Sequence, residues 1–151
     1  MVPVMQTSDN CFSACLASLL GIPIERVPDF RPCLHSSPCI YGGTEWSFKV
    51  NNWLAGRGLC LLTVPWHNIG GVYSAVKPLL CMVVGTSPHT KEELHVVVGK
   101  LYPRKHDNGM ITLEVEEIHD PCPAGGGIVQ VSCVFFLVQL NFSPYGSPRD
   151  K

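Results

Sequence analysis

The sequence has no two cysteines separated by two residues, although it contains eight cysteines in 151 residues. Zinc fingers and thioredoxin-like redox proteins usually carry such a pair, so its absence weakens both interpretations. A disulfide framework is typical of short secreted chains with small cores, which this chain does not resemble. Cys33, His35 and Cys39 lie close in sequence without an obvious fourth ligand. Whether they bind a metal or the two cysteines pair stays open, and we expect no metal site elsewhere.

Charge is also scarce, since charged residues make up 15% of the chain and the formal net charge is −1, against a hydrophobic fraction of 46%. This composition predicts a packed globule and lacks the basic field that recruits nucleic acid or anionic lipid. No apolar run is long enough to cross a bilayer, and no signal-peptide pattern precedes the first predicted helix. We therefore expect a cytoplasmic protein with one domain over residues 1–143 and a frayed polar tail over residues 144–151. The oligomeric state cannot be predicted from these features.

An amphipathic segment follows Asp9 and Asn10, which are good N-cap residues, and Gly21 is able to end it. The segment is predicted to be a helix with Cys11 in its first turn. Backbone N–H groups and the helix dipole favour an anion there, so we expect a lowered pKa for the Cys11 thiol. Cys11 is the candidate nucleophile. Cys15, one turn further on the same face, is interpreted as a small core residue.

Two predicted strands, residues 94–101 and 111–118, are joined through Asp107, Asn108 and Gly109, and read as an antiparallel hairpin. A turn centred near Asp107 and Asn108 places His95 across from Asp120. A register shift of one residue would put the two on opposite faces, whereas a shift of two would keep them as neighbours. A cysteine nucleophile needs a base and a group that orients the base, and this pair supplies both.

The other histidines have weaker sequence contexts. His119 is expected to point to the face opposite Asp120, because side chains alternate along a strand. His67 lies in an ambiguous segment, and His35, His89 and His106 fall in predicted loops.

Further elements complete the expected architecture. Residues 44–55 are predicted to form a helix that Thr44 caps and Gly56 ends, with Trp46, Val50, Trp53 and Leu54 on one face. Strands are predicted at residues 60–64, 80–84 and 129–140. Residues 29–43 read as a long loop.

The segment QTSDNCFSACLASLLG at residues 6–21 resembles the active-site helix of papain-like cysteine peptidases. It is most similar to the peptidase domains that remove double-glycine leaders from bacteriocins. HVVVG at residues 95–99 resembles the strand that opens with their catalytic histidine, and IHDP at residues 118–121 resembles their later Asp-Pro segment. Two features depart from the pattern: Gln6 is slightly closer to the cysteine, and Phe12 replaces a glycine after it. No transporter segment follows, so we expect a stand-alone domain.

The resemblance implies an α+β, papain-like fold whose catalytic N-terminal helix packs against an antiparallel sheet. Cys11 would be the nucleophile, His95 the general base and acid, and Asp120 the residue that orients the imidazole. Gln6 would contribute to the oxyanion hole together with the Cys11 N–H group. Asn10, Phe12 and Ser87 are candidate substrate-binding residues. Phe12 would lie at the lip of the cleft and Ser87 on a substrate-binding rim, although an ordinary turn is the favoured interpretation of the segment that contains Ser87.

The expected activity is cysteine hydrolysis of a peptide, isopeptide or related amide through a thioester, without a cofactor. A small amide or a glutamine side chain is also a possible substrate. An acyltransferase with the same triad and an inactive papain-like binding module remain as alternatives. A redox protein is less favoured, because Cys11 and Cys15 are poorly placed for a disulfide within one helix.

Overall fold

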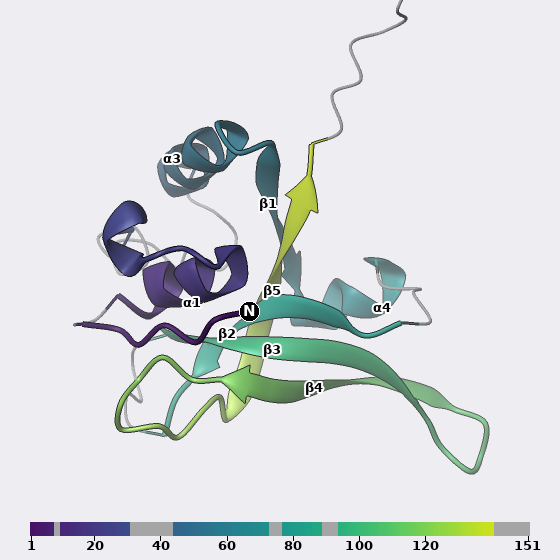
Figure 1. The fold of residues 1–151 in the computed structure, drawn as a ribbon. Helices are drawn as coiled ribbons and strands as arrows, with labels where there is room; N and C mark the ends of the chain where they lie inside the picture. Colours follow the sequence, from purple (N-terminus) through teal and green to yellow (C-terminus); the bar gives the residue numbers. More distant parts are fainter. Residues whose placement is uncertain (8–9, 31–43, 73–76, 89–93, 141–151) are drawn as a thin grey trace, which may run out of the picture.

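A five-stranded antiparallel sheet with the strand order β1-β5-β2-β3-β4 forms the centre of the molecule (Figure 1). A computed structural model describes residues 1–7, 10–30, 44–72, 77–88 and 94–140 of the chain. The strands are β1 (Leu59–Pro65), β2 (Leu79–Thr86), β3 (Leu94–Lys105), β4 (Ile111–His119) and β5 (Gln130–Gln139). All four strand pairs are antiparallel, and helices α1 (Cys11–Leu20) and α3 (Thr44–Ala55) lie beside the sheet. The protein therefore has an α+β fold.

Alternation along the strands divides the core into two layers. The face that carries Val96 and Val98 packs against α1 and α3, where Leu16 and Val50 are fully buried. The opposite face carries Val97 and packs in part against two short helices, η3 (Trp66–Asn68) and α4 (Ile69–Val72). Since both faces of the central strands are covered, their sequences are almost continuously apolar rather than alternating.

Helix α1 begins and ends at the predicted residues. Asn10 is its N-cap residue, and Gly21 adopts the left-handed conformation (φ 65°) with its N–H directed at the carbonyls of Ala17 and Ser18. Residues Cys11 through Ser18 are all buried. The Ser18 hydroxyl donates to the Ala14 carbonyl (2.9 Å) and accepts the Val4 N–H (2.9 Å), so it anchors the N-terminal segment on the helix.

Helix α3 has the predicted length, but its ends differ in detail from the prediction. Thr44 is the first helical residue rather than the cap. After Ala55 the left-handed residue is Gly58 (φ 69°), not Gly56, because the chain makes a further turn in which the Gly58 N–H donates to the Ala55 carbonyl (3.0 Å). A single 3₁₀ turn, η1 (Ile24–Arg26), follows Gly21.

Several predictions concern residues outside the described part of the chain. These are most of the loop at residues 29–43, the group Cys33, His35 and Cys39, residue His89, and the tail at residues 144–151. Within the described ranges, no helix is both long and apolar enough to cross a membrane.

Candidate active site

The β3–β4 hairpin turns at the predicted residues. Its strand register differs from the expected one, and a bulge in β4 shifts it once more. Lys105 faces Ile111 and Gly99 faces Glu117, which is one residue away from the expected alignment. The register then shifts, so that Val98 faces His119 and Ile118 is the extra residue of a bulge. The main part of the hairpin is shifted by one residue from the expected alignment, and the bulge adds a second residue. A total shift of two residues keeps the side chains of His95 and Asp120 on the same face. The chain beyond β4 therefore brings Asp120 to His95.

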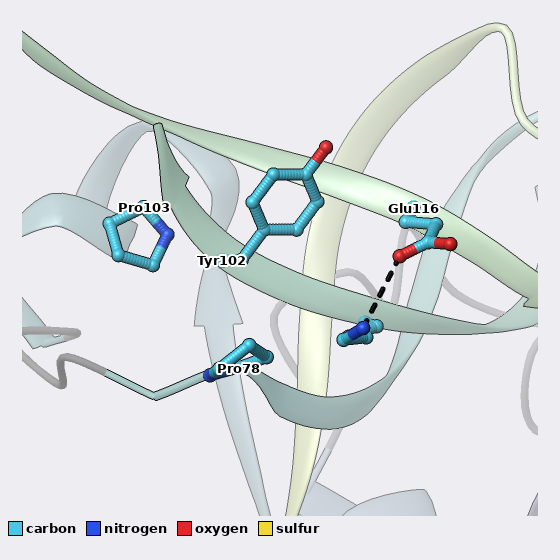
Figure 2. Close-up of a pocket in the computed structure, with 5 residues that line it drawn as sticks. Pro78, Tyr102, Pro103 and Glu116 are labelled. Carbon is cyan, nitrogen blue, oxygen red and sulfur yellow. Dashed lines mark hydrogen bonds and ion pairs between the residues drawn. The ribbon is translucent and has the colours of Figure 1, made fainter. Parts of the chain in front are cut away.

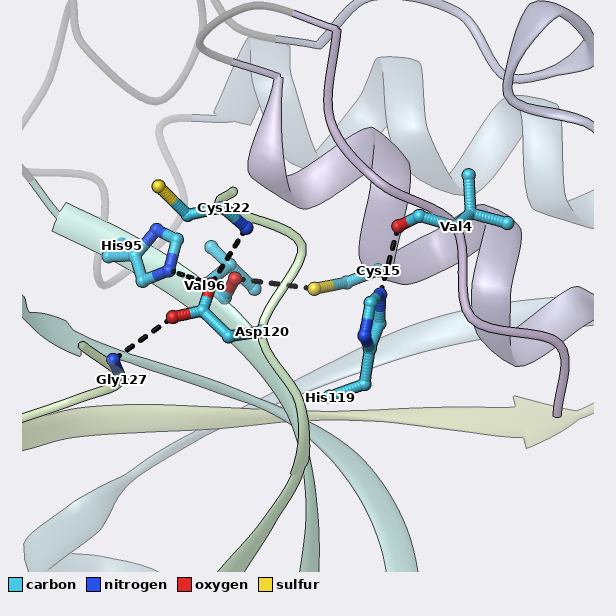
Figure 3. A network of polar contacts seen from close by, with 8 residues as sticks. All are labelled: Val4, Cys15, His95, Val96, His119, Asp120, Cys122 and Gly127. Carbon is cyan, nitrogen blue, oxygen red and sulfur yellow. Dashed lines mark hydrogen bonds and ion pairs between the residues drawn. The ribbon is translucent and has the colours of Figure 1, made fainter. Parts of the chain in front are cut away.

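His95 and Asp120 form a short, buried hydrogen bond, as predicted. The Nε2–H of His95 donates to Oδ1 of Asp120 at 2.7 Å, and the two side chains are only 10% and 8% exposed (Figure 3). Asp120 is itself held by backbone groups: the Cys122 N–H donates to Oδ1 (2.8 Å) and the Gly127 N–H to Oδ2 (3.0 Å). Because Nε2 is engaged by Asp120, Nδ1 is the ring nitrogen left to act as a base.

These bonds set the charge of Asp120. Burial raises the pKa of the carboxyl, but the hydrogen bonds from Cys122, His95 and Gly127 and the charge of His95 outweigh this effect, so the pKa is lowered. Asp120 is therefore a stable carboxylate, the form that orients and stabilises a protonated imidazole.

Cys11 lies at the N-terminal end of α1, beside the start of β3. The backbone N–H groups of Val96, the residue that follows His95, and of Phe12 and Cys11 act on its sulfur in the direction that lowers the pKa of the thiol. The charge of Asp120 also acts on this thiol. The structure thus brings Cys11 to the segment that carries His95 and to the electrostatic field of Asp120.

The predicted lowering of the Cys11 pKa is wrong for this structure. Burial of the sulfur raises the pKa above its ordinary value, and the negative charge of Asp120 adds to the effect. The three N–H groups act in the opposite direction but do not outweigh burial. The residue is 8% exposed, so the protein favours the neutral thiol at rest.

Cys15 is a core residue, as interpreted from the sequence. It is fully buried, and its thiol donates to the Val96 carbonyl at 3.3 Å (Figure 3). Cys11 and Cys15 therefore both lie near the backbone of Val96 in β3, Cys11 on its N–H side and Cys15 at its carbonyl. Strand β4 pairs with β3 only as far as Val98, so the helix thiols bind backbone groups beyond the end of that pairing.

Gln6 lies on the N-terminal segment next to the Asp120 turn. Its backbone N–H donates to the Pro121 carbonyl (2.9 Å), and its carboxamide oxygen is buried without a hydrogen-bond partner. Its role in an oxyanion hole stays a prediction. Asn10 is correctly placed as the N-cap residue but makes no capping bond with its side chain. Its carboxamide instead binds Thr7, accepting the N–H (3.1 Å) and donating to the hydroxyl (3.3 Å).

Two predicted substrate-binding residues are buried, and for Phe12 this contradicts the expected position, whereas the role of Ser87 stays a prediction. Phe12 is 1% exposed and packs edge-on against Phe30, Trp46 and Phe135, so it belongs to the core and not to the lip of a cleft. The sequence already indicated this burial, because Phe12 is the first residue of the apolar face of the predicted helix. Ser87 follows β2 and is 7% exposed, which gives no support to an open substrate rim.

The remaining described histidines have structural partners or are exposed. His119 points away from Asp120, and its Nε2–H donates to the Val4 carbonyl at 2.9 Å, so it fixes the N-terminal segment (Figure 3). His106 forms a hydrogen bond with the Thr112 hydroxyl (2.7 Å) near the hairpin turn. His67 is an exposed residue of η3.

Glycines support the site in ways that sequence reasoning missed. Gly85 faces His95 in β2, and a Cβ there would lie 2.0 Å from the Gln130 carbonyl oxygen and 2.6 Å from the Ile128 side chain. Gly127 has a positive φ of 60° and supplies the N–H that binds Asp120. The glycine run at residues 125–127 was visible in the sequence, but which of its N–H groups meets a carboxylate depends on the tertiary fold.

A separate surface hollow lies over the middle of the β3–β4 hairpin (Figure 2). Its lining includes Pro78, Tyr102 and Pro103, together with Lys100 and Glu116, whose ion pair is 3.5 Å long. None of the predicted site residues lines it. No group of three or more potential metal ligands occurs within the described ranges.

Comparison of the chain with family models, curated proteins and solved structures yields no match.

Proposed function

We propose that the protein is a papain-like cysteine hydrolase that cleaves a peptide, isopeptide or related amide bond. The observation that carries the proposal is the buried 2.7 Å hydrogen bond between His95 and Asp120, the carboxylate whose charge also acts on the thiol of Cys11 at a helix N-terminus. Asp120 accepts three hydrogen bonds and stays ionised, so it fixes the orientation of the imidazole and leaves Nδ1 for proton transfer.

The raised pKa of Cys11 indicates how the reaction begins. The thiol transfers its proton to Nδ1 of His95 while the sulfur attacks the substrate carbonyl carbon. The protonated imidazole then lies against the Asp120 carboxylate, which stabilises the positive charge that develops. The Cys11 N–H is one donor to the tetrahedral oxyanion, and the Gln6 carboxamide is the second donor that the family resemblance implies.

Collapse of the tetrahedral intermediate completes acylation. The C–N bond breaks, the leaving amine takes the proton from His95, and a thioester to Cys11 remains. Water then loses a proton to His95 as it attacks the thioester carbon, and a carboxylic acid and the free thiol are released. An amine acceptor in place of water would give the acyltransferase alternative by the same proton transfers.

The test is the alkylation rate of each cysteine by iodoacetamide against pH, followed by peptide mass spectrometry. In the wild-type protein we expect Cys11 to react faster at pH 7 than the partly exposed thiols of Cys60 and Cys122. The variant His95→Ala should slow Cys11 alone, by at least about tenfold, since a positioned general base contributes 10²–10⁴-fold in catalysis. His67→Ala is the matched control and should leave the rate unchanged.

Two results would contradict the proposal. Equal rates for Cys11 and Cys122 across the pH range would indicate an inactive binding module. A His95→Ala variant that is folded and keeps the wild-type Cys11 rate would show that this histidine is not the base.

A further inference from the structure

Glu117 places a second carboxylate beside the His95–Asp120 pair. The residue is near the end of β4, opposite Gly99, two positions before His119. Its carboxylate accepts a hydrogen bond from the Ile128 N–H, and a Cβ on Gly127 would lie only 2.2 Å from its Oε2 atom. The carboxylate is therefore packed directly on the backbone of residues 127 and 128.

Asp120 and Glu117 bind consecutive N–H groups of the same loop. The Gly127 N–H donates to Oδ2 of Asp120 (3.0 Å), and the next N–H along the chain, that of Ile128, donates to Glu117. Displacement of this loop would remove one of the three donors that orient the Asp120 carboxylate. Glu117 therefore ties the loop to β4 at the point where it supports Asp120.

We propose that Glu117 is a positioning residue of the candidate active site. It holds the loop at residues 125–128 so that Asp120 keeps its orientation toward His95. The inference rests on the proposed function and deepens it, because it adds a residue that acts on the base through Asp120.

The surrounding charges fit this role. Burial and the charge of Asp120 raise the pKa of the Glu117 carboxyl, whereas His95, the Ile128 N–H and His119 act to lower it. The neighbouring thiol of Cys15 is also within reach of the Glu117 charge.

The experiment compares Glu117→Gln and Glu117→Ala with the same two changes at Glu116. Glu116 is the matched control because it lies on the same strand and pairs with Lys100 (3.5 Å) instead of the loop. NMR gives the exchange rates of the Gly127 and Ile128 amide protons. The pH dependence of Cys11 alkylation is measured on the same variants.

For Glu117→Ala we expect faster exchange of both amide protons and a lower rate of Cys11 alkylation, because the loop that supports Asp120 is released. Glu117→Gln keeps an acceptor for the Ile128 N–H, so the exchange rates and the alkylation rate should stay closer to wild type. The Glu116 variants should change neither readout.

The inference is overturned if the Glu117 and Glu116 variants have the same amide exchange and the same pH dependence of Cys11 alkylation. A loss of thermal stability in the Glu117 variants without a change in Cys11 alkylation would show a structural role only. Failure of the proposed function is a separate outcome, because an unreactive Cys11 in the wild-type protein leaves the amide-exchange measurement intact.

Discussion

The substitution Asp120→Asn tests the centre of the candidate site. It keeps one oxygen that can accept from His95 and Cys122, but it replaces the other oxygen with an NH₂ group that faces the Gly127 N–H. An unsatisfied buried N–H costs about 1–3 kcal/mol, and the bond to His95 loses its charge assistance, which is worth about 1 kcal/mol. We expect the free energy of unfolding to fall by roughly 2–4 kcal/mol at pH 7.

The pH dependence of this loss has a definite sign. The pKa of Asp120 is lower in the folded protein than in the unfolded chain, because hydrogen bonds from Cys122, His95 and Gly127 and the charge of His95 outweigh the opposing effect of burial. Its contribution to stability is therefore present above the unfolded pKa of about 3.9 and is lost as the pH falls through the folded pKa. The difference between wild type and Asp120→Asn should shrink when the pH is lowered from 7 to 3.

Urea unfolding followed by tryptophan fluorescence measures both quantities. Asp107→Asn is the matched control, because Asp107 is exposed in the hairpin turn and its loss should change stability by no more than about 0.5 kcal/mol. An Asp120→Asn protein as stable as wild type, with no pH dependence of the difference, would refute the pairing of His95 with a buried carboxylate. A loss of stability without a slower Cys11 alkylation would refute the role of Asp120 in orienting His95 as the base.

Two further substitutions test the packing that supports the site. Gly85→Ala should destabilise the protein and slow Cys11 alkylation, because the new Cβ would lie 2.0 Å from the Gln130 carbonyl oxygen, a backbone atom that cannot move aside easily. Gly56→Ala is the control, since the nearest atom to its Cβ would be 3.6 Å away. Equal melting temperatures for the two variants would contradict the clash. Phe12→Ala should lower the free energy of unfolding by about 3–5 kcal/mol, as for a buried aromatic residue. Phe48→Ala is the control and should change it little, because Phe48 is 66% exposed. A small loss of stability in Phe12→Ala together with altered substrate turnover would instead place Phe12 at the cleft.

The sequence alone predicted the main elements of the fold, because their signals are local. The apolar stripe from Phe12 and the ability of Gly21 to adopt a positive φ defined α1, and period-2 alternation with Asn108 and Gly109 defined the β3–β4 hairpin. The hairpin also made the contact between His95 and Asp120 predictable, since the turn fixes which residues can meet across two strands.

Other features depend on the tertiary structure. The bulge at Ile118 preserves the shared face of His95 and Asp120, yet no local pattern in the strand marks it. The pKa of Cys11 was mispredicted because helix position is a local property, whereas the burial that raises the pKa comes from the packing of α1 against β3. Apart from His95, the donors to Asp120 are backbone N–H groups, which every residue but proline has, so only the path of the chain decides which of them reach the carboxylate.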